Sequence, residues 1–97
     1  MKIRWTHPAL NDLFAAQTYV AQHNPQAAQA MAQRLWDAAQ DLENHPQIGR
    51  PGHALDTRER VVPRTPYLIV YRLRHDTVEI LCIWHGRRDW PSESEAD

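Results

Sequence analysis

The last third of the chain contains three apolar stretches in which arginines recur: RERVVPR at 58–64, YLIVYR at 67–72 and ILCIWHGRRDWP at 80–91. The first two predict strands over 58–63 and 67–73, joined by a turn at 64–66. The third strand is expected over 78–85, which is apolar at nearly every position and therefore typical of an inner strand covered on both faces. Arginines that alternate with apolar neighbours project from one face, so neighbouring strands should gather positive charge there.

The first half of the chain predicts a short strand, 2–6, followed by two helices. Asn24 and Pro25 separate the helices, because Asn is a good N-cap and Pro fits the first helical turn. The expected inward stripe of the first helix is Leu10, Leu13, Phe14, Val20 and Ala21, and only Gln17 breaks it. The expected stripe of the second is Ala28, Met31, Leu35, Ala38 and Leu42, widened by Trp36 and Ala39.

These elements predict an α+β fold with an N-terminal strand, an antiparallel helical hairpin and then a three-stranded antiparallel sheet. The connection between the helices is short enough to force them into a hairpin. Residues 47–53 are rich in glycine and proline, which indicates an irregular loop. We expect the hairpin to cover one face of the sheet and to leave the other for a partner or substrate.

A chain of 97 residues is long enough for one domain, which we expect to span 1–91, with an acidic tail at 92–97. The apolar fraction of 42% is ordinary for a globular protein. No apolar run approaches the roughly 18 residues of a membrane helix, and no secretory signal opens the chain, so a cytoplasmic protein is expected.

Charge is unevenly distributed although the net charge is only −1. Residues 48–91 carry eight arginines and five carboxylates, a net charge of +3, whereas the tail carries three carboxylates and no cation. This distribution suits an anionic partner, and a solvated surface is the alternative. Cys82 is expected to be a small buried residue. The scattered histidines predict no metal site, and no cofactor is expected.

The order of these elements, together with GRPG at 49–52, TRERVV at 57–62, PYLIVYR at 66–72 and ILCIWHGRRDWP at 80–91, resembles the RelE/ParE toxin superfamily. The likeness is closest to the ParE-type, or plasmid-stabilisation, toxins. It implies the toxin of a type II toxin-antitoxin module, neutralised by a cognate antitoxin that is small, partly disordered and DNA-binding. It also allows a heterotetramer or a larger complex with that antitoxin.

The superfamily contains both ribosome-dependent mRNA endonucleases and inhibitors of DNA gyrase. RNA cleavage needs a base, an acid and cations around the phosphoryl group. Lys2 is the only lysine, which excludes a lysine-based mechanism of the RelE type. The YoeB-like combination of glutamate, arginine and histidine has candidates in Glu59, Arg64 or Arg72, and His85, although alternation places Glu59 on the face opposite Arg58 and Arg60.

The ParE likeness favours a gyrase inhibitor that needs no catalytic residue. In this interpretation Arg87, Arg88 and Trp90 bind the target, and Arg58, Arg60 and Arg64 bind the antitoxin or another anion. His85 then has a structural role at the end of its strand.

A nucleic-acid-binding module, with arginines and aromatics on the sheet, is a further alternative. Tyr67 and Tyr71 argue against it, because they share a parity with Ile69 and so belong to a core face.

Overall fold

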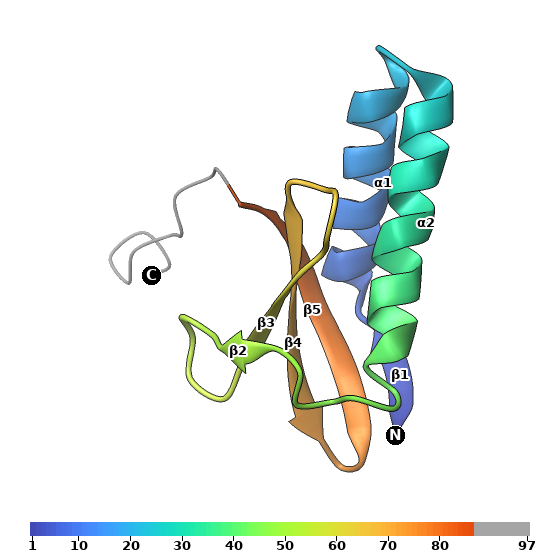
Figure 1. Ribbon diagram of the computed structural model, residues 1–97. Coiled ribbons are helices and arrows are strands. Elements are labelled where there is room, and N and C mark those ends of the chain that lie inside the picture. The colour runs from blue at the N-terminus through green and yellow to red at the C-terminus, as the bar shows by residue number, and fades with distance from the viewer. Residues whose placement is uncertain (87–97) are drawn as a thin grey trace.

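The computed structural model describes residues 1–86, in which two helices lie along one face of a mixed sheet (Figure 1). The elements are β1 (Lys2–Trp5), α1 (His7–Ala21), α2 (Pro25–Asp41), β2 (Arg50–Pro51), β3 (Arg58–Val61), β4 (Tyr67–Arg74) and β5 (Thr77–His85). The strand order is β1-β5-β4-β3-β2, with β1 parallel to β5 and every other pair antiparallel. The predicted α+β class and helical hairpin are confirmed.

The sheet has five strands where the sequence predicts a separate strand and a sheet of three. The N-terminal strand joins the same sheet, because β1 pairs with β5 from 75 residues away. Part of the predicted loop at 47–53 forms β2, a two-residue edge strand opposite Arg58 and Glu59. A proline is tolerated there, because an outer edge requires no amide donor. The strand predicted to end at Pro63 stops at Val61.

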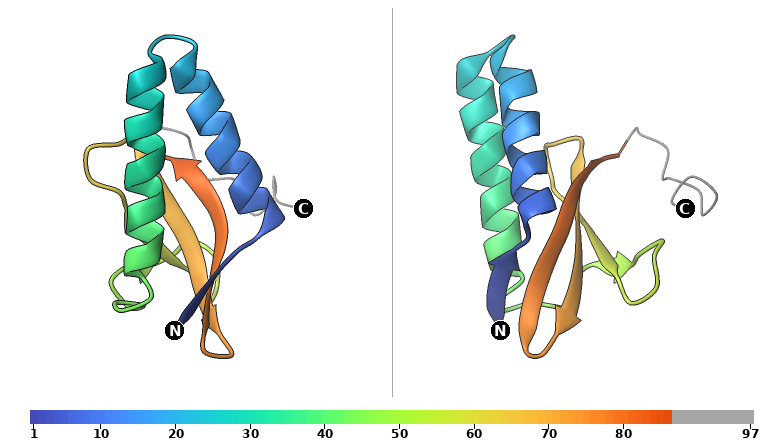
Figure 2. Two further views of the ribbon diagram at one scale, coloured as in Figure 1. Left: turned by 90° about the vertical axis from the view of Figure 1, so that its right-hand side faces the viewer. Right: turned by 180° about the vertical axis from the view of Figure 1, so that it is seen from behind.

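Both helices begin at side chains that cap their first turns. The Thr6 hydroxyl oxygen accepts a hydrogen bond from the Ala9 amide at 3.3 Å, and the Asn24 side chain accepts one from the Ala27 amide at 3.1 Å. The predicted break at Asn24 and Pro25 is therefore confirmed. It reverses the chain, and the two helices run antiparallel (Figure 2).

The inward stripe of α1 differs from the predicted one. Ala9 and Ala16 are buried, Leu13 and Val20 pack against the core, and Phe14 is 63% exposed. Small alanines allow close approach to α2 and β5, and this turns the helix so that Phe14 faces outward. Sequence periodicity alone favoured the larger apolar residue.

The predicted stripe of α2 is confirmed by the burial of all five of its members: Ala28, Met31, Leu35, Ala38 and Leu42. Ala39 is also buried. Trp36 is not a core residue, since it is 42% exposed and stacks on Trp5 with ring centroids 5.5 Å apart. Trp5 belongs to the edge strand β1, so its ring covers one face of the Trp36 ring and leaves the rest in solvent.

The core lies between the helices and the sheet face formed by Ile69, Tyr71, Val78, Ile80 and Ile83. A bulge interrupts the pairing of β4 with β5: Val70 pairs with Cys82, but the next residue, Tyr71, pairs with Ile80. The extra residue on β5, Leu81, allows both Ile80 and Ile83 to face the helices. The bulge explains why this part of β5 does not show simple alternation in the sequence.

Tyr71 connects this core to the loop that follows α2. Its hydroxyl donates a hydrogen bond to the Pro46 carbonyl at 2.8 Å and accepts one from the Gly49 amide at 2.9 Å. Burial raises the pKa of Tyr71, so the hydroxyl keeps its proton for the first bond. A Cβ on residue 49 would lie 2.7 Å from the Tyr71 oxygen, and this close approach explains the glycine.

We expect Tyr71→Phe to lower the free energy of unfolding by about 1–3 kcal/mol, because it leaves a backbone donor and a backbone acceptor unpaired. Urea unfolding followed by circular dichroism measures this. Tyr19→Phe is the matched control, since Tyr19 is 64% exposed on α1; its effect should stay below about 0.5 kcal/mol. Equal stability of Tyr71→Phe and the wild type would contradict the assigned role.

Candidate functional site

The two helices leave the other face of the sheet uncovered (Figure 2). This face carries both charged and apolar side chains. Because successive side chains on a strand point to opposite faces, the residues next to the core positions point to this face. These are Glu59 and Val61 on β3, Leu68, Val70, Arg72 and Arg74 on β4, Thr77, Glu79, Cys82 and Trp84 on β5, and Lys2 and Arg4 on β1. This surface is called the open face below.

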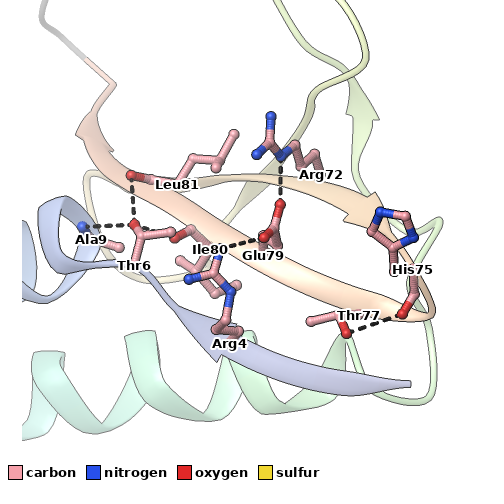
Figure 3. A network of polar contacts seen from close by, with 9 residues as sticks. All are labelled: Arg4, Thr6, Ala9, Arg72, His75, Thr77, Glu79, Ile80 and Leu81. Carbon is pink, nitrogen blue, oxygen red and sulfur yellow. Dashed lines mark hydrogen bonds and ion pairs between the residues drawn. The ribbon is translucent and has the colours of Figure 1, made fainter.

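Glu79 is the centre of one ion-pair network on the open face (Figure 3). Arg4 on β1 and Arg72 on β4 both reach its carboxylate, the latter with Nε 2.6 Å from Oε1. The hydrogen bonds from Arg4 and then Arg72 lower the pKa of Glu79 to about 2. One carboxylate shared by two guanidinium groups leaves a net positive charge on these three strands.

Glu59 is the centre of a second network. It is 2% exposed, and one of its oxygens accepts a hydrogen bond from the His53 amide at 3.0 Å and lies 2.7 Å from Nδ1 of the same histidine. Arg50 approaches the other oxygen at 3.4 Å. Burial alone would raise the pKa of Glu59, but the His53 hydrogen bonds and charge outweigh it, and the pKa is lowered. Glu59 thereby fixes the loop between β2 and β3.

Arg58 and Arg60 lie on the opposite face from Glu59, as the alternation predicts. Both bind groups of this chain. Arg58 Nη1 donates to the carbonyls of Gly49 at 2.8 Å and Gln47 at 3.2 Å. Arg60 Nη1 donates to the Ala38 carbonyl at 2.7 Å and lies 3.1 Å from Oδ2 of Asp41. Of the three arginines predicted to bind an antitoxin or anion, these two hold the end of α2 and the following loop against β3.

Arg64 is the third of those arginines, and it is exposed in the turn after β3 with a positive φ of 63°. It borders a groove of about 540 Å³ together with Arg34, Asp37, Asp41 and Arg60. Within residues 1–86, the side chains of Arg34 and Arg64 have no hydrogen bond or ion pair. This groove between α2 and the turn is therefore a site where guanidinium groups remain available to a partner.

His85 lies in another groove, of about 600 Å³, between α1 and the ends of β4 and β5. Its ring meets the edge of Tyr67, with centroids 5.2 Å apart. Asp12 and Tyr19 of α1 also line this groove, and Asp12 accepts a hydrogen bond from the Ile83 amide at 3.0 Å. Sequence analysis missed both α1 residues, since only the packing of the helix on β5 brings them to the histidine.

The four residues considered for RNA cleavage occupy separate environments. Glu59 and Arg72 each belong to an ion-pair network, Arg64 borders the α2 groove, and His85 lies under α1. The expected target-binding residues, Arg87, Arg88 and Trp90, lie outside the described residues.

Three further expectations concern Cys82, metal ligands and membrane helices. Burial, with the charges of Asp12 and Glu59, raises the pKa of the half-buried Cys82 to about 11, so the thiol is protonated at neutral pH. Among residues 1–86, no cluster of three His, Cys, Asp or Glu side chains could hold a metal ion. Neither of the helices described there has the length and apolar character to cross a membrane.

A family model described as the ParE toxin of the type II toxin-antitoxin system parDE matches residues 3–90. The chain belongs to the ParE toxin family. It is 40% identical over 90 residues to "Putative toxin Y4kP" of Sinorhizobium fredii, with 93% of each chain covered. It is 41% identical over 87 residues to "Toxin RelE2" of Caulobacter vibrioides, covering 90% of this chain and 97% of the relative.

A solved structure described as the chromosomal ParDE TA system from P. aeruginosa is similar to this ParE-family toxin with a TM-score of 0.79. The two chains are 26% identical, and the match covers 88% of this chain and 95% of the other. The resemblance seen in the sequence is thereby confirmed at the level of the family and the fold.

The Glu79 network predicts that the free energy of unfolding of this ParE-family toxin depends on pH. The pKa of Glu79 is about 2 in the folded protein, below its ordinary value of 4.5, so the unfolded chain binds this proton more readily. The contribution of the Glu79 ion pairs to the free energy of unfolding is therefore complete above about pH 4.5 and is lost as the pH falls through about 2.

Urea unfolding of the wild type and Glu79→Gln between neutral pH and about pH 2 tests this. The stability difference should shrink as the pH falls below about 4.5. Glu43→Gln, at an exposed glutamate after α2, is the control and should follow the wild type. A difference that stays constant down to about pH 2 would refute the linkage.

Proposed function

We infer that this ParE-family toxin inhibits DNA gyrase without hydrolytic chemistry and is neutralised by a cognate antitoxin. The observation that carries this is the separation of the residues that an RNA-cleaving site would need. A general base and a general acid must come within hydrogen-bond reach of the same substrate. Here Glu59 and His85 lie on different sides of the sheet, beside different elements.

The ion pairs add a second argument. Both oxygens of Glu59 already have partners, and its lowered pKa makes it a weak base. Arg72 is bound to Glu79 through Nε. Moving either residue toward a phosphate would break an ion pair and leave its partner without that interaction. A function in which the toxin binds its target and stalls it requires none of these movements.

An antitoxin suits the exposed surfaces on the helix side of the molecule. Phe14 and Tyr19 on α1 are each more than 60% exposed, and the α2 groove has the available guanidinium groups of Arg34 and Arg64. A partner segment with apolar and acidic side chains is complementary to such a surface. The similar structure is described as a ParDE TA system, which supports an antitoxin as the partner. The proposed complex with the antitoxin is a heterotetramer or a larger assembly.

Purified gyrase tests the proposed target directly. Supercoiling of relaxed plasmid should fall as the toxin is added and recover when the antitoxin is added in equal amount. Translation and mRNA integrity, measured in a ribosome-containing extract with the same toxin preparation, should stay unchanged. Cleaved mRNA together with normal supercoiling would instead establish the endonuclease alternative.

Alanine variants of the C-terminal segment separate binding from catalysis. We expect Arg88→Ala and Trp90→Ala to reduce growth inhibition, because arginine and tryptophan are common interface anchors whose truncation costs about 2 kcal/mol or more. His85→Ala should retain most of the toxicity, since its ring packs against Tyr67 on the helix side and Glu59 lies on the opposite face of the sheet. Each variant is first shown to be folded by circular dichroism.

The opposite pattern of toxicity would support the endonuclease alternative. A folded His85→Ala that is harmless, beside fully toxic Arg88→Ala and Trp90→Ala, would indicate that His85 acts as a general acid. Growth inhibition is read in the absence of antitoxin, so that altered neutralisation does not affect the comparison.

A further inference from the structure

One end of the open face, next to the β4–β5 turn, carries a concentration of cations. The pairing of β1, β5 and β4 aligns two rows of side chains across three strands. Lys2, Thr77 and Arg74 form one row, and Arg4, Glu79 and Arg72 form the other. These six residues are called the sheet patch below.

The sheet patch has four cations and one carboxylate, a net charge of +3. The nearby Asp76, exposed in the turn, lowers this locally to +2. Glu79 is already bound to Arg4 and Arg72, whose side chains are 56% and 37% exposed. The side chains of Lys2 and Arg74 are exposed and make no hydrogen bond or ion pair with any other residue in the range 1–86. Most of the positive charge is therefore available to a partner.

The chemistry of the sheet patch favours phosphate over an acidic peptide. Its members are four cations, a threonine and a glutamate, so it offers no apolar side chain on which a folding peptide segment could anchor. Arginine has five N–H donors in a planar arrangement that matches phosphate oxygens, and each arginine bound to Glu79 keeps further donors. Lysine adds a point charge that also binds phosphate.

The spacing of the strands suits an extended polyanion. Residues two apart on a strand are separated by about 6.7 Å, and β1 and β4, with β5 between them, are about 10 Å apart. The cations are thus spread across a flat surface and do not converge on a single small ion. A duplex, with closely spaced phosphates along both strands, can meet several of them together.

We propose that the sheet patch of this toxin binds the phosphate backbone of duplex DNA. Such binding is independent of sequence and weak, because it uses phosphate contacts alone. It would hold the toxin on the DNA on which gyrase acts, and it leaves the helix-side surfaces for the antitoxin. The proposal does not depend on gyrase being the target, since it concerns DNA binding by the toxin alone.

Fluorescence anisotropy with a labelled duplex of mixed sequence, at increasing salt concentration, tests the proposal. For the wild type, the logarithm of the association constant should fall with the logarithm of the salt concentration with a slope of about −3. This slope is expected for about three to four phosphate contacts. The double variant Lys2→Gln/Arg74→Gln should bind at least about tenfold more weakly at low salt, with a slope smaller in magnitude by about 2. Arg4 and Arg72 are left unchanged, so the Glu79 network stays intact.

The matched control is Arg34→Gln/Arg64→Gln, which removes the same charge from the α2 groove on the helix side. Its DNA affinity and salt slope should stay near those of the wild type. The proposal is overturned if the wild type shows no salt-dependent DNA binding, or if both double variants lose affinity equally. It is also overturned if Lys2→Gln/Arg74→Gln binds DNA normally but loses the antitoxin, because the sheet patch would then be a peptide interface. Failure of the toxin to inhibit gyrase, with DNA binding as described, would refute the gyrase target alone.

Discussion

The hydroxyl group of Tyr71 connects the parts of this fold that the chain places far apart. Its ring is completely buried between the helices and the sheet, and its oxygen binds backbone groups on both sides of the turn that leaves α2. That turn leads into β2, and β2 pairs with β3. The position of β3 then determines where Glu59 and Arg60 point. A polar atom at the edge of an apolar core therefore sets the geometry of the charged surfaces outside it.

The two buried carboxylates of the open face have different consequences. Glu59 is held by Arg50 of β2 and by His53 of the loop that follows, so its main effect is local: it keeps the segment between β2 and β3 in place. Glu79 is held by arginines from two strands that lie on either side of β5. It joins the edge strand β1 to the centre of the sheet, and it allows two arginines to lie close together with little mutual repulsion. The same pairing brings positive charge from β1 and β4 into one patch across β5.

The helix side and the open face of the molecule present different chemistry. On the helix side, exposed aromatic rings of α1 accompany two grooves, whereas the cation-rich end of the open face carries no apolar side chain. A partner that folds on the toxin needs apolar anchors, and a polyanion needs spread positive charge. The surfaces proposed for the antitoxin and for DNA are therefore different, so the two proposed interactions are separable by mutation.

Much of the fold could be predicted from the sequence, because its signals act over short distances. The cap at Asn24, the inward stripe of α2 and the three long strands depend on side chains a few residues apart. The alternation that separates Glu59 from Arg58 and Arg60 is equally local. The likeness to ParE toxins also rests on the order of such segments, and so it was visible before the structure.

Other features required the tertiary structure, because they depend on residues that meet only after folding. No local pattern shows that β1 lies parallel to β5, that Leu81 is an extra residue in a bulge, or that Phe14 faces solvent. From the sequence, the arginines of β3 are expected to form a free basic surface. In the structure they bind Asp41 and backbone carbonyls. Lys2 and Arg4 belong to a cationic surface only because 75 residues later Thr77 and Glu79 pair with them, and a long-range strand register of this kind is decided by the packing of the whole sheet.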